Sequence, residues 1–463
     1  MDLFLVNDPS TSALQDGPQL LPCASVVAAN NTAYQSIVSS SANSLLLVAI
    51  LVLAIAQTKD PVHEASKCTE QEKVQIIEEI WKMLSADPHQ EHRVKLRQVL
   101  KSLTLTTRHI PTCFVLAKVV YIPAGSERHH LRSGSAGYVH MCLLGRKTAV
   151  ATKQFIALED RIIAMIHSDA VAWATLRHPN VMQVLGITSI SLSVPYNMPR
   201  LVMPWMENRA IIHQIRYFED ELHIEPPLSS WIRQIAMGLE YLHREGIVHG
   251  AMRSSNVMVD DDNVIKLMDY ETEKHIWRHG AGFETAIEQE PIAWYTPEQY
   301  LHLNRVVEPT QEGDVYGFGC IWLHLHSRHA PYADYPYRMA ILHQWGRCIG
   351  VSWPEVGLQP PHTIQELESL DVWQHVRKCL SQSPSERPRA SELQQIADFD
   401  TLWIRQVYED PISYEDLPPR YPFVPPRRYR YAKYRMRLCV QATLDAIHAT
   451  YLSLTETFFK RPN

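Results

Sequence analysis

Several short segments of the chain carry residues suited to handling phosphates. The segment RSGSAGYV contains Gly134 and Gly137, and a glycine-rich turn lets backbone amides approach phosphate oxygens closely. Lys153 ends the segment AVATK and supplies a cation. Farther along, Asn256 and Asp269 offer oxygen donors of the kind that magnesium prefers. Together these residue types predict chemistry on a polyphosphate held with Mg²⁺.

The segments around Asn256 and Asp269 have a recognisable spacing. HGAMRSSN ends at Asn256, and DYE begins at Asp269. They resemble the catalytic loop (H-R-D-x-x-x-x-N) and the D-F-G motif of protein kinases. The resemblance makes Asn256 and Asp269 the magnesium ligands and Arg253 the cation that steadies the transferring phosphate. The position of the catalytic base is Ala251, which has no proton acceptor.

The resemblance extends to the segments that precede this loop. RSGSAGYV resembles the kinase glycine-rich loop, with Val139 as the apolar residue that faces the base. AVATK resembles the strand whose lysine, here Lys153, grips the α- and β-phosphates, and Ala151 of this strand joins the nucleotide-binding set. Asp169 stands where the family has a glutamate that holds this lysine. Because aspartate is one methylene shorter, its helix must come closer or the pair stays loose.

A hinge and a set of scaffold residues complete the resemblance. LVMPWMEN resembles the strand and hinge between two lobes, with Met203 as gatekeeper. The backbone at Trp205 and Met206 would hydrogen-bond an adenine. The motifs WYTPE, GDVYGFGC and SERPRASEL match scaffold elements of the larger lobe, and they supply Glu298, Asp314 and Arg387. From these we expect an ion pair of Arg387 with Glu298 and a brace from Asp314 to the catalytic loop.

The order of these motifs predicts the fold. The resemblance covers residues 112–400 and is closest to the tyrosine-kinase-like group of protein kinases, in the style of its fungal expansion. It implies an α+β, bilobal protein-kinase fold. We expect an antiparallel β-sheet in an N-lobe at 112–205 and a mainly helical C-lobe at 206–400.

Four departures from the family pattern bear on activity. Ala251 removes the base, and Asp169 shortens the carboxylate that holds the lysine. Arg132 replaces the first glycine of the glycine-rich loop, and Glu271 replaces the glycine of D-F-G. These changes predict a pseudokinase that binds ATP and Mg²⁺ weakly and acts on protein partners as a scaffold or regulator.

Two other functions fit the same residues. One is a low-activity Ser/Thr protein kinase that uses Lys153, Asn256 and Asp269. The other is a membrane-anchored structural scaffold that binds no nucleotide. The formal net charge of −6 argues against a nucleic-acid partner for the whole chain. The eight cysteines are scattered without a C-x-x-C pair, which favours isolated thiols over a zinc site or a disulfide framework.

An apolar run lies near the N-terminus. Residues 1–43 contain no Lys or Arg and no clear period, so we expect them to be disordered. Residues 44–57 include the run LLLVAILVLAIA, which predicts a membrane anchor once it is extended back to residue 37. The first lysines follow the run, so the positive-inside rule places the kinase-like part in the cytoplasm. The alternatives are a buried core helix and a soluble cytoplasmic protein.

Flanking segments complete the organisation of the chain. Residues 60–111 are expected to form a helical extension, in which Thr69 and Glu72 make a capping box. Residues 401–463 form a basic and aromatic tail, with seven cations and five aromatic residues between 420 and 437. Such a cluster could contact anionic lipid. The alternative is a solvated tail that packs on the adjacent lobe.

Overall fold

A computed structural model describes eleven stretches of the chain. They are residues 44–86, 92–121, 131–134, 137–145, 148–155, 160–188, 200–270, 294–301, 308–328, 330 and 371–393. The described residues fall into two compact units. The first unit comprises the described residues up to Arg177 together with 183–204. The second unit comprises 178–182 and the described residues from Trp205 onward.

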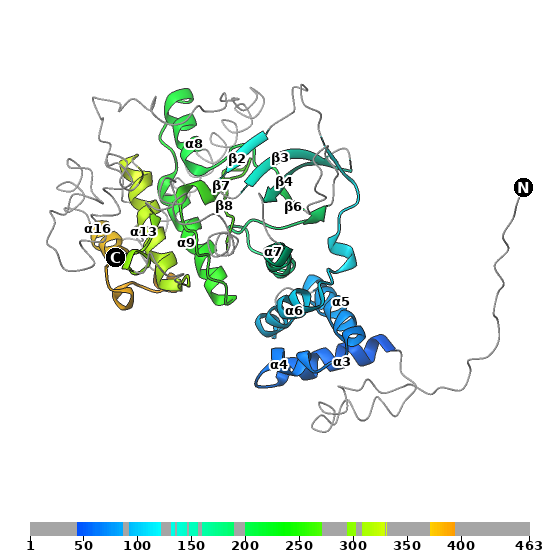
Figure 1. Ribbon diagram of the computed structural model, residues 1–463. Coiled ribbons are helices and arrows are strands. Elements are labelled where there is room, and N and C mark those ends of the chain that lie inside the picture. The colour runs from blue at the N-terminus through cyan, green and yellow to red at the C-terminus, as the bar shows by residue number, and fades with distance from the viewer. Residues whose placement is uncertain are drawn as a thin grey trace, which may run out of the picture. The chain divides into compact units, whose positions relative to one another are not determined.

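The first unit contains an antiparallel β-sheet of six strands. The strand order is β1-β3-β4-β6-β5, and β2 pairs with β3 at the side. The strands are β1 Val119–Tyr121, β2 Leu131–Gly134, β3 Gly137–Leu144, β4 Thr148–Phe155, β5 Gly186–Thr188 and β6 Arg200–Pro204. This sheet and the helices of the second unit confirm the predicted α+β class (Figure 1).

The two faces of this sheet differ in composition. One face carries a buried apolar cluster made by Val119, Cys142, Val150 and Val202. Because side chains alternate along a strand, the neighbouring positions point to the opposite face. That face carries the lysine of the AVATK segment. The alternation therefore separates the packing positions of the sheet from its candidate binding positions.

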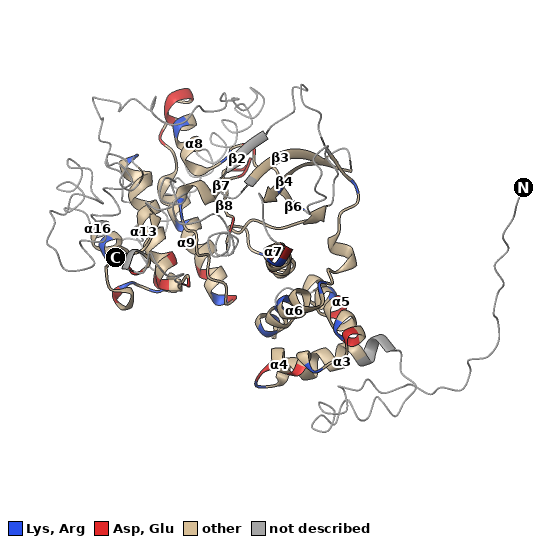
Figure 2. Cartoon of the chain, in the orientation of Figure 1, with Lys and Arg blue, Asp and Glu red and all other residues tan. Residues whose placement is uncertain are grey.

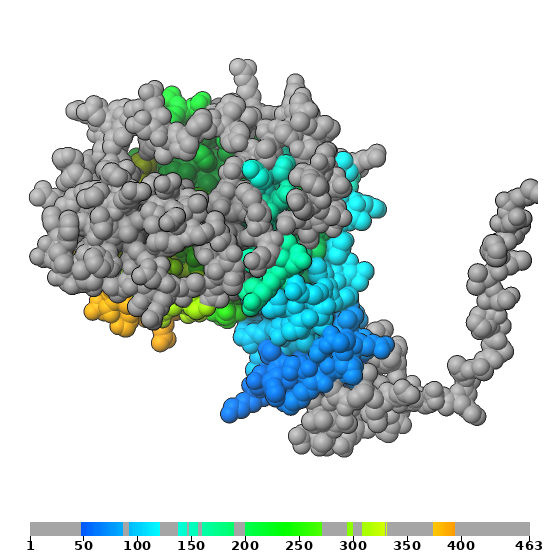
Figure 3. Space-filling model, in the orientation of Figure 1, coloured from blue at the N-terminus to red at the C-terminus, as the bar shows by residue number. Residues whose placement is uncertain are grey.

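The first unit also contains helices. They are α3 Ser44–Gln57, α4 Pro61–Ser66, α5 Glu70–Ala86, α6 Arg93–Thr107, the short helix η1 Thr112–Phe114, and α7 Asp160–Trp173. The predicted capping box is present at the start of α5, where Thr69 N donates to Glu72 Oε2 at 2.7 Å and Glu72 N donates to Thr69 Oγ1 at 3.3 Å. In the space-filling view the blue atoms of α3–α6 and the cyan atoms that follow form one continuous surface (Figure 3).

The apolar run forms a packed helix, and the predicted membrane anchor at 44–57 is wrong. Among the described residues, no helix is both long and apolar enough to cross a membrane. Helix α3 has 14 residues, and Leu51, Val52 and Ile55 are each about 1% exposed because α3 packs against α5. In Figure 2 the described part of α3 shows no Lys, Arg, Asp or Glu, whereas α5 shows both basic and acidic residues and α6 shows basic ones.

The sequence prediction overlooked the partners of this run. Helix α5 presents Ile76, Ile77 and Ile80, which are at most 1% exposed, and α6 contributes a second buried stripe. Lys95 of α6 also donates to the carbonyl oxygens of Ala56 and Thr58, at 3.2 Å each, at the C-terminal end of α3. The predicted placement of the chain as a single-pass membrane protein depended on this anchor and is therefore wrong as well.

The second unit is mainly helical. Its elements are α8 Ile211–Arg216, the π-helical turn η2 Tyr217–Glu221, α9 Leu228–Arg244, η3 Ser254–Asn256, β7 Val257–Val259, β8 Ile265–Leu267, α12 Pro297–Leu301, α13 Gln311–Ser327, α16 Asp371–Cys379, η5 Pro384–Glu386 and α17 Ala390–Leu393. Helix α13 is buried along almost its whole length and packs against α9 and α16. It is the central helix of this unit.

Some sequence predictions concern residues outside the described stretches. These are the disordered segment 1–43, the tail 401–463 with its lipid-contact cluster 420–437, and Glu271. The prediction of isolated thiols is wrong for Cys68, which is disulfide-bonded. Cys113, Cys142, Cys320 and Cys379 are free.

Candidate active site

The glycine-rich segment forms a hairpin in the first unit. Gly134 at the end of β2 pairs with Gly137 at the start of β3, and Arg132 pairs with Val139. Next to this hairpin, Val139 lies directly opposite Lys153 of β4. Directly opposed residues share a face of the sheet. The predicted base-facing residue and the predicted phosphate-binding lysine are therefore neighbours on one face.

The same face continues across the next strand. Lys153 lies opposite Leu201 of β6, and Ala151 lies opposite Met203. Ala151 and Met203 are 8% and 5% exposed, and Lys153 is 4% exposed. The Lys153 ammonium lies 5.6 Å from the centroid of the Phe155 ring. The register thus brings four predicted nucleotide-binding residues together: Val139, Ala151, Lys153 and Met203.

Asp169 has a partner that the sequence analysis missed. This residue lies on α7 and is fully buried. Its carboxylate forms an ion pair with Lys101 of α6, a helix of the extension. A buried carboxylate needs such a cation, because an unpaired charge in the interior is strongly unfavourable. The residue expected to hold Lys153 is therefore also bound by the extension.

The predicted hinge lies at the division between the two units. Pro204 ends the first unit and Trp205 begins the second. Met206 is 9% exposed, and Trp205 Nε1 donates to the Glu207 carboxylate at 2.9 Å. The hinge motif therefore lies where the chain passes from the first unit to the second.

The predicted catalytic loop is fastened by Asp314 of α13. The Asp314 carboxylate accepts hydrogen bonds from His249 N and Gly250 N at 2.7 Å each. It also contacts His243 Nε2 of α9 at 2.8 Å. Gly250 has φ +74°, a left-handed conformation that favours glycine. The brace expected from Asp314 is present, and His243 adds a third contact.

Inside the loop, Asn256 holds the backbone at Ala251. Asn256 Nδ2 donates to Ala251 O at 2.9 Å, and Asn256 N donates to Arg253 O at 2.9 Å. Arg253 is 6% exposed. The Ala251 N–H donates to His249 Nδ1 at 3.3 Å. Burial lowers the pKa of His249, which keeps this ring neutral and able to accept that bond.

The strand β8 brings Asp269 back beside the loop. Strands β7 and β8 form an antiparallel pair, and Met268 N donates to Asn256 O at 3.0 Å. This bond joins the residue before Asp269 to Asn256. Asp269 has φ +61°, which aspartate adopts more readily than most residues. The structure thus brings both predicted magnesium ligands to one end of this strand pair.

This donor set fits a magnesium ion that also binds phosphates. Asn and Asp supply neutral and anionic oxygens, and Mg²⁺ commonly takes one or two protein carboxylates plus phosphate oxygens and water. In the described part of the chain, no group of three or more His, Cys, Asp or Glu side chains could hold a metal ion by itself. Asp260 lies in the β7–β8 turn, where its carboxylate accepts from Asp262 N and Val264 N at 2.9 Å each.

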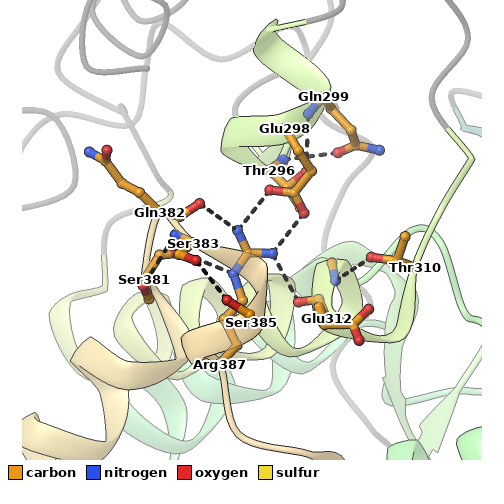
Figure 4. Close-up of polar contacts among 11 residues, drawn as sticks. Thr296, Glu298, Gln299, Thr310, Glu312, Ser381, Gln382, Ser383, Ser385 and Arg387 are labelled. Carbon is orange, nitrogen blue, oxygen red and sulfur yellow. Dashed lines mark hydrogen bonds and ion pairs between the residues drawn. The ribbon is translucent and has the colours of Figure 1, made fainter. Parts of the chain in front are cut away.

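Arg387 anchors the start of α12 (Figure 4). Its Nη1 and Nη2 each donate to one Glu298 carboxylate oxygen at 2.7 Å, as the sequence predicts. Its Nε donates to Ser381 O at 2.9 Å, and Nη1 also donates to Glu312 O at 3.1 Å. The guanidinium lies 5.0 Å from the Tyr316 ring centroid. One buried cation therefore ties together α12, α13 and the segment before α17.

Comparison with known proteins identifies the family. The family model described as protein tyrosine and serine/threonine kinase matches residues 126–396. The chain belongs to this protein-kinase family. The predicted kinase fold is confirmed, while the finer assignment to a fungal expansion stays a prediction.

Several curated kinases are similar to this kinase domain. Mitogen-activated protein kinase kinase kinase dlk-1 of Caenorhabditis briggsae is 27% identical over 272 residues, 58% of this chain and 28% of that protein. Mitogen-activated protein kinase kinase kinase 3 of Arabidopsis thaliana is 26% identical over 274 residues, 57% of this chain and 40% of that protein. Epidermal growth factor receptor of Apis mellifera is 27% identical over 228 residues, 49% of this chain and 16% of that protein. The chain spans less than half the length of each relative.

The sequence analysis of the kinase domain missed three supporting residues. Lys101 lies in the extension, outside every kinase motif, and no pattern pointed to it. His243 had a weak indication, because it lies in the helix that leads into the catalytic loop. Gly317 lies within the GDVYGFGC motif, and a Cβ there would lie 2.6 Å from Met252 Cβ and 2.7 Å from Met252 O. This glycine lets α13 approach the loop.

Proposed function

We propose that this chain is an ATP-dependent protein kinase whose phosphotransfer is slow because position 251 lacks a carboxylate. The observation that carries the proposal is the ordered loop of the second unit. Asp314 fastens its start, and the bond from Met268 N to Asn256 O sets Asp269 beside it. This register brings Asn256 and Asp269 to one end of the strand pair, an arrangement that supports binding of a nucleotide with Mg²⁺.

Family membership assigns roles to the residues of each unit. In such kinases the strand lysine, here Lys153, binds the α- and β-phosphates, and the loop residues Asn256 and Asp269 hold magnesium. When bound, the metal neutralises charge on the phosphates. Val139, Ala151 and Met203 offer the adenine an apolar surface on the sheet. Most of the positioning apparatus is therefore kept.

The reaction would move the γ-phosphoryl group of ATP to a protein hydroxyl. The bond between the γ-phosphorus and its bridging oxygen breaks, and ADP leaves with that oxygen. A bond forms from the substrate oxygen to phosphorus, and the hydroxyl proton passes to water or a phosphate oxygen. Ala251 cannot accept it. Relatives named as mitogen-activated protein kinase kinase kinases favour another protein as the substrate, and we propose a Ser or Thr hydroxyl as the acceptor.

The size of the defect follows from general acid–base catalysis. A positioned base contributes about 10²- to 10⁴-fold. Kinases commonly turn over about 1 to 100 times per second. Losing the base alone leaves a rate of about 10⁻⁴ to 1 per second on these figures. Such an enzyme is slow and measurable.

The deciding experiment measures transfer from labelled ATP by the full chain with Mg²⁺. We expect weak labelling of the chain or a generic protein substrate, abolished by Lys153→Met, and about 10²- to 10⁴-fold faster labelling by Ala251→Asp. Asp260→Asn is the matched control, since Asp260 lies in the β7–β8 turn. No labelling by the natural chain above the Lys153→Met background overturns the proposal.

A pseudokinase that regulates protein partners is the second candidate. Ala251 favours it, and so does the Lys101 contact on Asp169, which draws on the carboxylate that Lys153 would use. In that case the natural chain is silent, and Ala251→Asp restores transfer. Silence from both, with no ATP-induced rise in melting temperature, indicates a scaffold that binds no nucleotide.

A further inference from the structure

Tyr270 carries a hydroxyl that the kinase pattern does not require. It follows Asp269 and takes the place of the phenylalanine of D-F-G. The side chain is 2% exposed, and its hydroxyl donates to Met182 O at 3.0 Å. The ring meets His249 of the catalytic loop edge-on, with 6.1 Å between the ring centroids. A phenylalanine would keep the ring contact and lose the hydrogen bond, so this bond is a feature of this chain and not of the family pattern.

The carbonyl that accepts this bond belongs to a segment that is fixed within the second unit. Met182 N donates to Leu267 O at 2.8 Å, and Leu267 N donates to Asn180 O at 2.9 Å. The Asn180 side chain also donates to α9 at 3.0 Å and to β8 at 3.1 Å. The segment 178–182 therefore cannot shift without breaking several hydrogen bonds, and it offers the Tyr270 hydroxyl a stationary acceptor.

Asp269 lies between two such fixed points. On one side Met268 N donates to Asn256 O at 3.0 Å, and on the other side the Tyr270 hydroxyl is bound to Met182 O. Asp269 itself has φ +61°, in the left-handed region that residues with a Cβ populate less than the right-handed and extended regions. A hydrogen bond on each side therefore supports a backbone conformation that Asp269 would otherwise adopt less often.

We propose that Tyr270 is a positioning residue whose hydroxyl, through its bond to Met182 O, holds Asp269 in place to bind Mg²⁺ together with the phosphates of ATP. This inference rests on the proposed function, since it concerns a magnesium ligand of the same site. Mg²⁺ demands near-ideal octahedral geometry, and a ligand that is ordered before binding loses less conformational freedom when the metal binds. The hydroxyl should therefore matter to the metal-dependent part of ATP binding.

The test compares the Kd of ATP for the full chain in excess Mg²⁺ and in EDTA, both measured by calorimetry. The ratio of the Kd in EDTA to the Kd in Mg²⁺ is the metal gain. Tyr270→Phe removes the hydroxyl and keeps the ring. One hydrogen bond typically changes an equilibrium constant by about twofold to tenfold, so we expect the metal gain to fall by about that factor. The Kd in EDTA should stay at its natural value.

Tyr316→Phe is the matched control. Tyr316 lies on α13, is 1% exposed and packs against the Arg387 guanidinium, 5.0 Å from its ring centroid. The variant loses the same atom from an equally buried tyrosine of the same unit, so the metal gain should match that of the natural chain. Thermal melting sets one temperature at which all three proteins are folded, and the metal gains are compared there.

Hydrogen exchange of the metal-free chain provides a second measurement that needs no nucleotide. In Tyr270→Phe the Met268 N–H should exchange about twofold to tenfold faster than in the natural chain, because Asp269 is then supported from one side only. Tyr316→Phe should leave this rate unchanged.

The outcomes separate this inference from the proposed function. An unchanged metal gain in Tyr270→Phe, while the natural chain binds ATP more tightly with Mg²⁺ than without it, overturns this inference alone. An equal rise of both Kd values also overturns it, because the hydroxyl would then support the fold in general. Absence of a metal gain in the natural chain overturns this inference together with the magnesium role in the proposed function.

Discussion

The cluster around Arg387 and the loop around Ala251 lie in the same unit and differ in what they keep of the kinase pattern. Around Arg387 the expected residues are present, and the buried guanidinium donates to a carboxylate and to backbone carbonyls. In the loop the backbone is held as the family requires, yet the side chain at 251 is a methyl group. The contacts that hold the loop in place are therefore present, whereas the carboxylate expected at position 251 is absent.

Burial gives the physical reason for this difference. The Arg387 side chain is fully buried, so its loss would leave an unpaired charge and several carbonyls without donors. Ala251 is only partly buried, and its methyl group carries no charge that would have to be paired. A chain can therefore lose the base at little cost in stability, whereas it cannot lose the anchor.

The largest loss of stability is expected from breaking the anchor. Arg387→Leu strands the Glu298 carboxylate and should lower the free energy of unfolding by about 3–5 kcal/mol. Urea unfolding followed by circular dichroism measures this. Arg389→Leu is the control, since Arg389 is exposed and two positions away. A loss below about 1 kcal/mol would contradict the role of the ion pair.

The same pair gives a dependence on pH. Burial alone would raise the pKa of Glu298, but the hydrogen bonds and charge of Arg387 hold its pKa below the usual value. A lowered folded pKa adds stability above the unfolded pKa, and this is lost as pH falls through the folded pKa. Between about pH 5 and pH 3, the natural chain should therefore lose more stability than Arg387→Leu. Parallel curves would refute the assignment.

A smaller loss is expected from loosening the loop. Asp314→Asn replaces a charged acceptor of three contacts with a neutral one, and should cost about 2–3 kcal/mol. Combined with Ala251→Asp, it should also slow phosphotransfer, because His249 and Gly250 lose their brace. The exposed Glu312→Gln on the same helix serves as control. Unchanged transfer in the combined variant would show that the brace supports folding alone.

Crowding the loop should cost less again. Gly317→Ala places a Cβ 2.6 Å from Met252 Cβ, so α13 or the loop must shift, at about 1–3 kcal/mol. Gly313→Ala on the same helix meets its nearest atom, Thr310 Oγ1, at 3.3 Å, and should be far milder. Equal melting temperatures for the two variants would mean that the close approach at Met252 relaxes freely.

Local motifs sufficed to predict the kinase fold, while the roles that they assign to the site residues stay predictions. The motifs identified Val139, Lys153 and Met203 as candidate nucleotide-binding residues, whereas their shared face follows from the register of β3, β4 and β6, which the sequence analysis did not predict. The pair of Glu298 and Arg387 is 89 residues apart along the chain, and only the family pattern made it predictable.

The extension shows where sequence reasoning failed. The run in α3 was judged by its own composition, which suits a membrane as well as a protein core. The apolar face of α5 decides between a membrane and a protein core. This face begins at Ile76, 19 positions after α3 ends at Gln57. The contact of Lys101 with Asp169 is equally nonlocal. Long-range packing of this kind has no signature in a single sequence.

The smallest loss of stability is expected from Ala251→Asp, the substitution that would change the chemistry most. Ala251→Asp adds a carboxylate to a partly buried position near Asp269, and should lower stability by about 1 kcal/mol or less. Some like-charge repulsion with Asp269 is expected, and Mg²⁺ should reduce it. Urea unfolding with and without Mg²⁺ measures both effects. A loss as large as that of Arg387→Leu would show that the loop has adapted to the methyl group, so that scaffold and chemistry are no longer separable. A small loss joined to faster transfer would show that the anchor region still supports a loop able to receive its base.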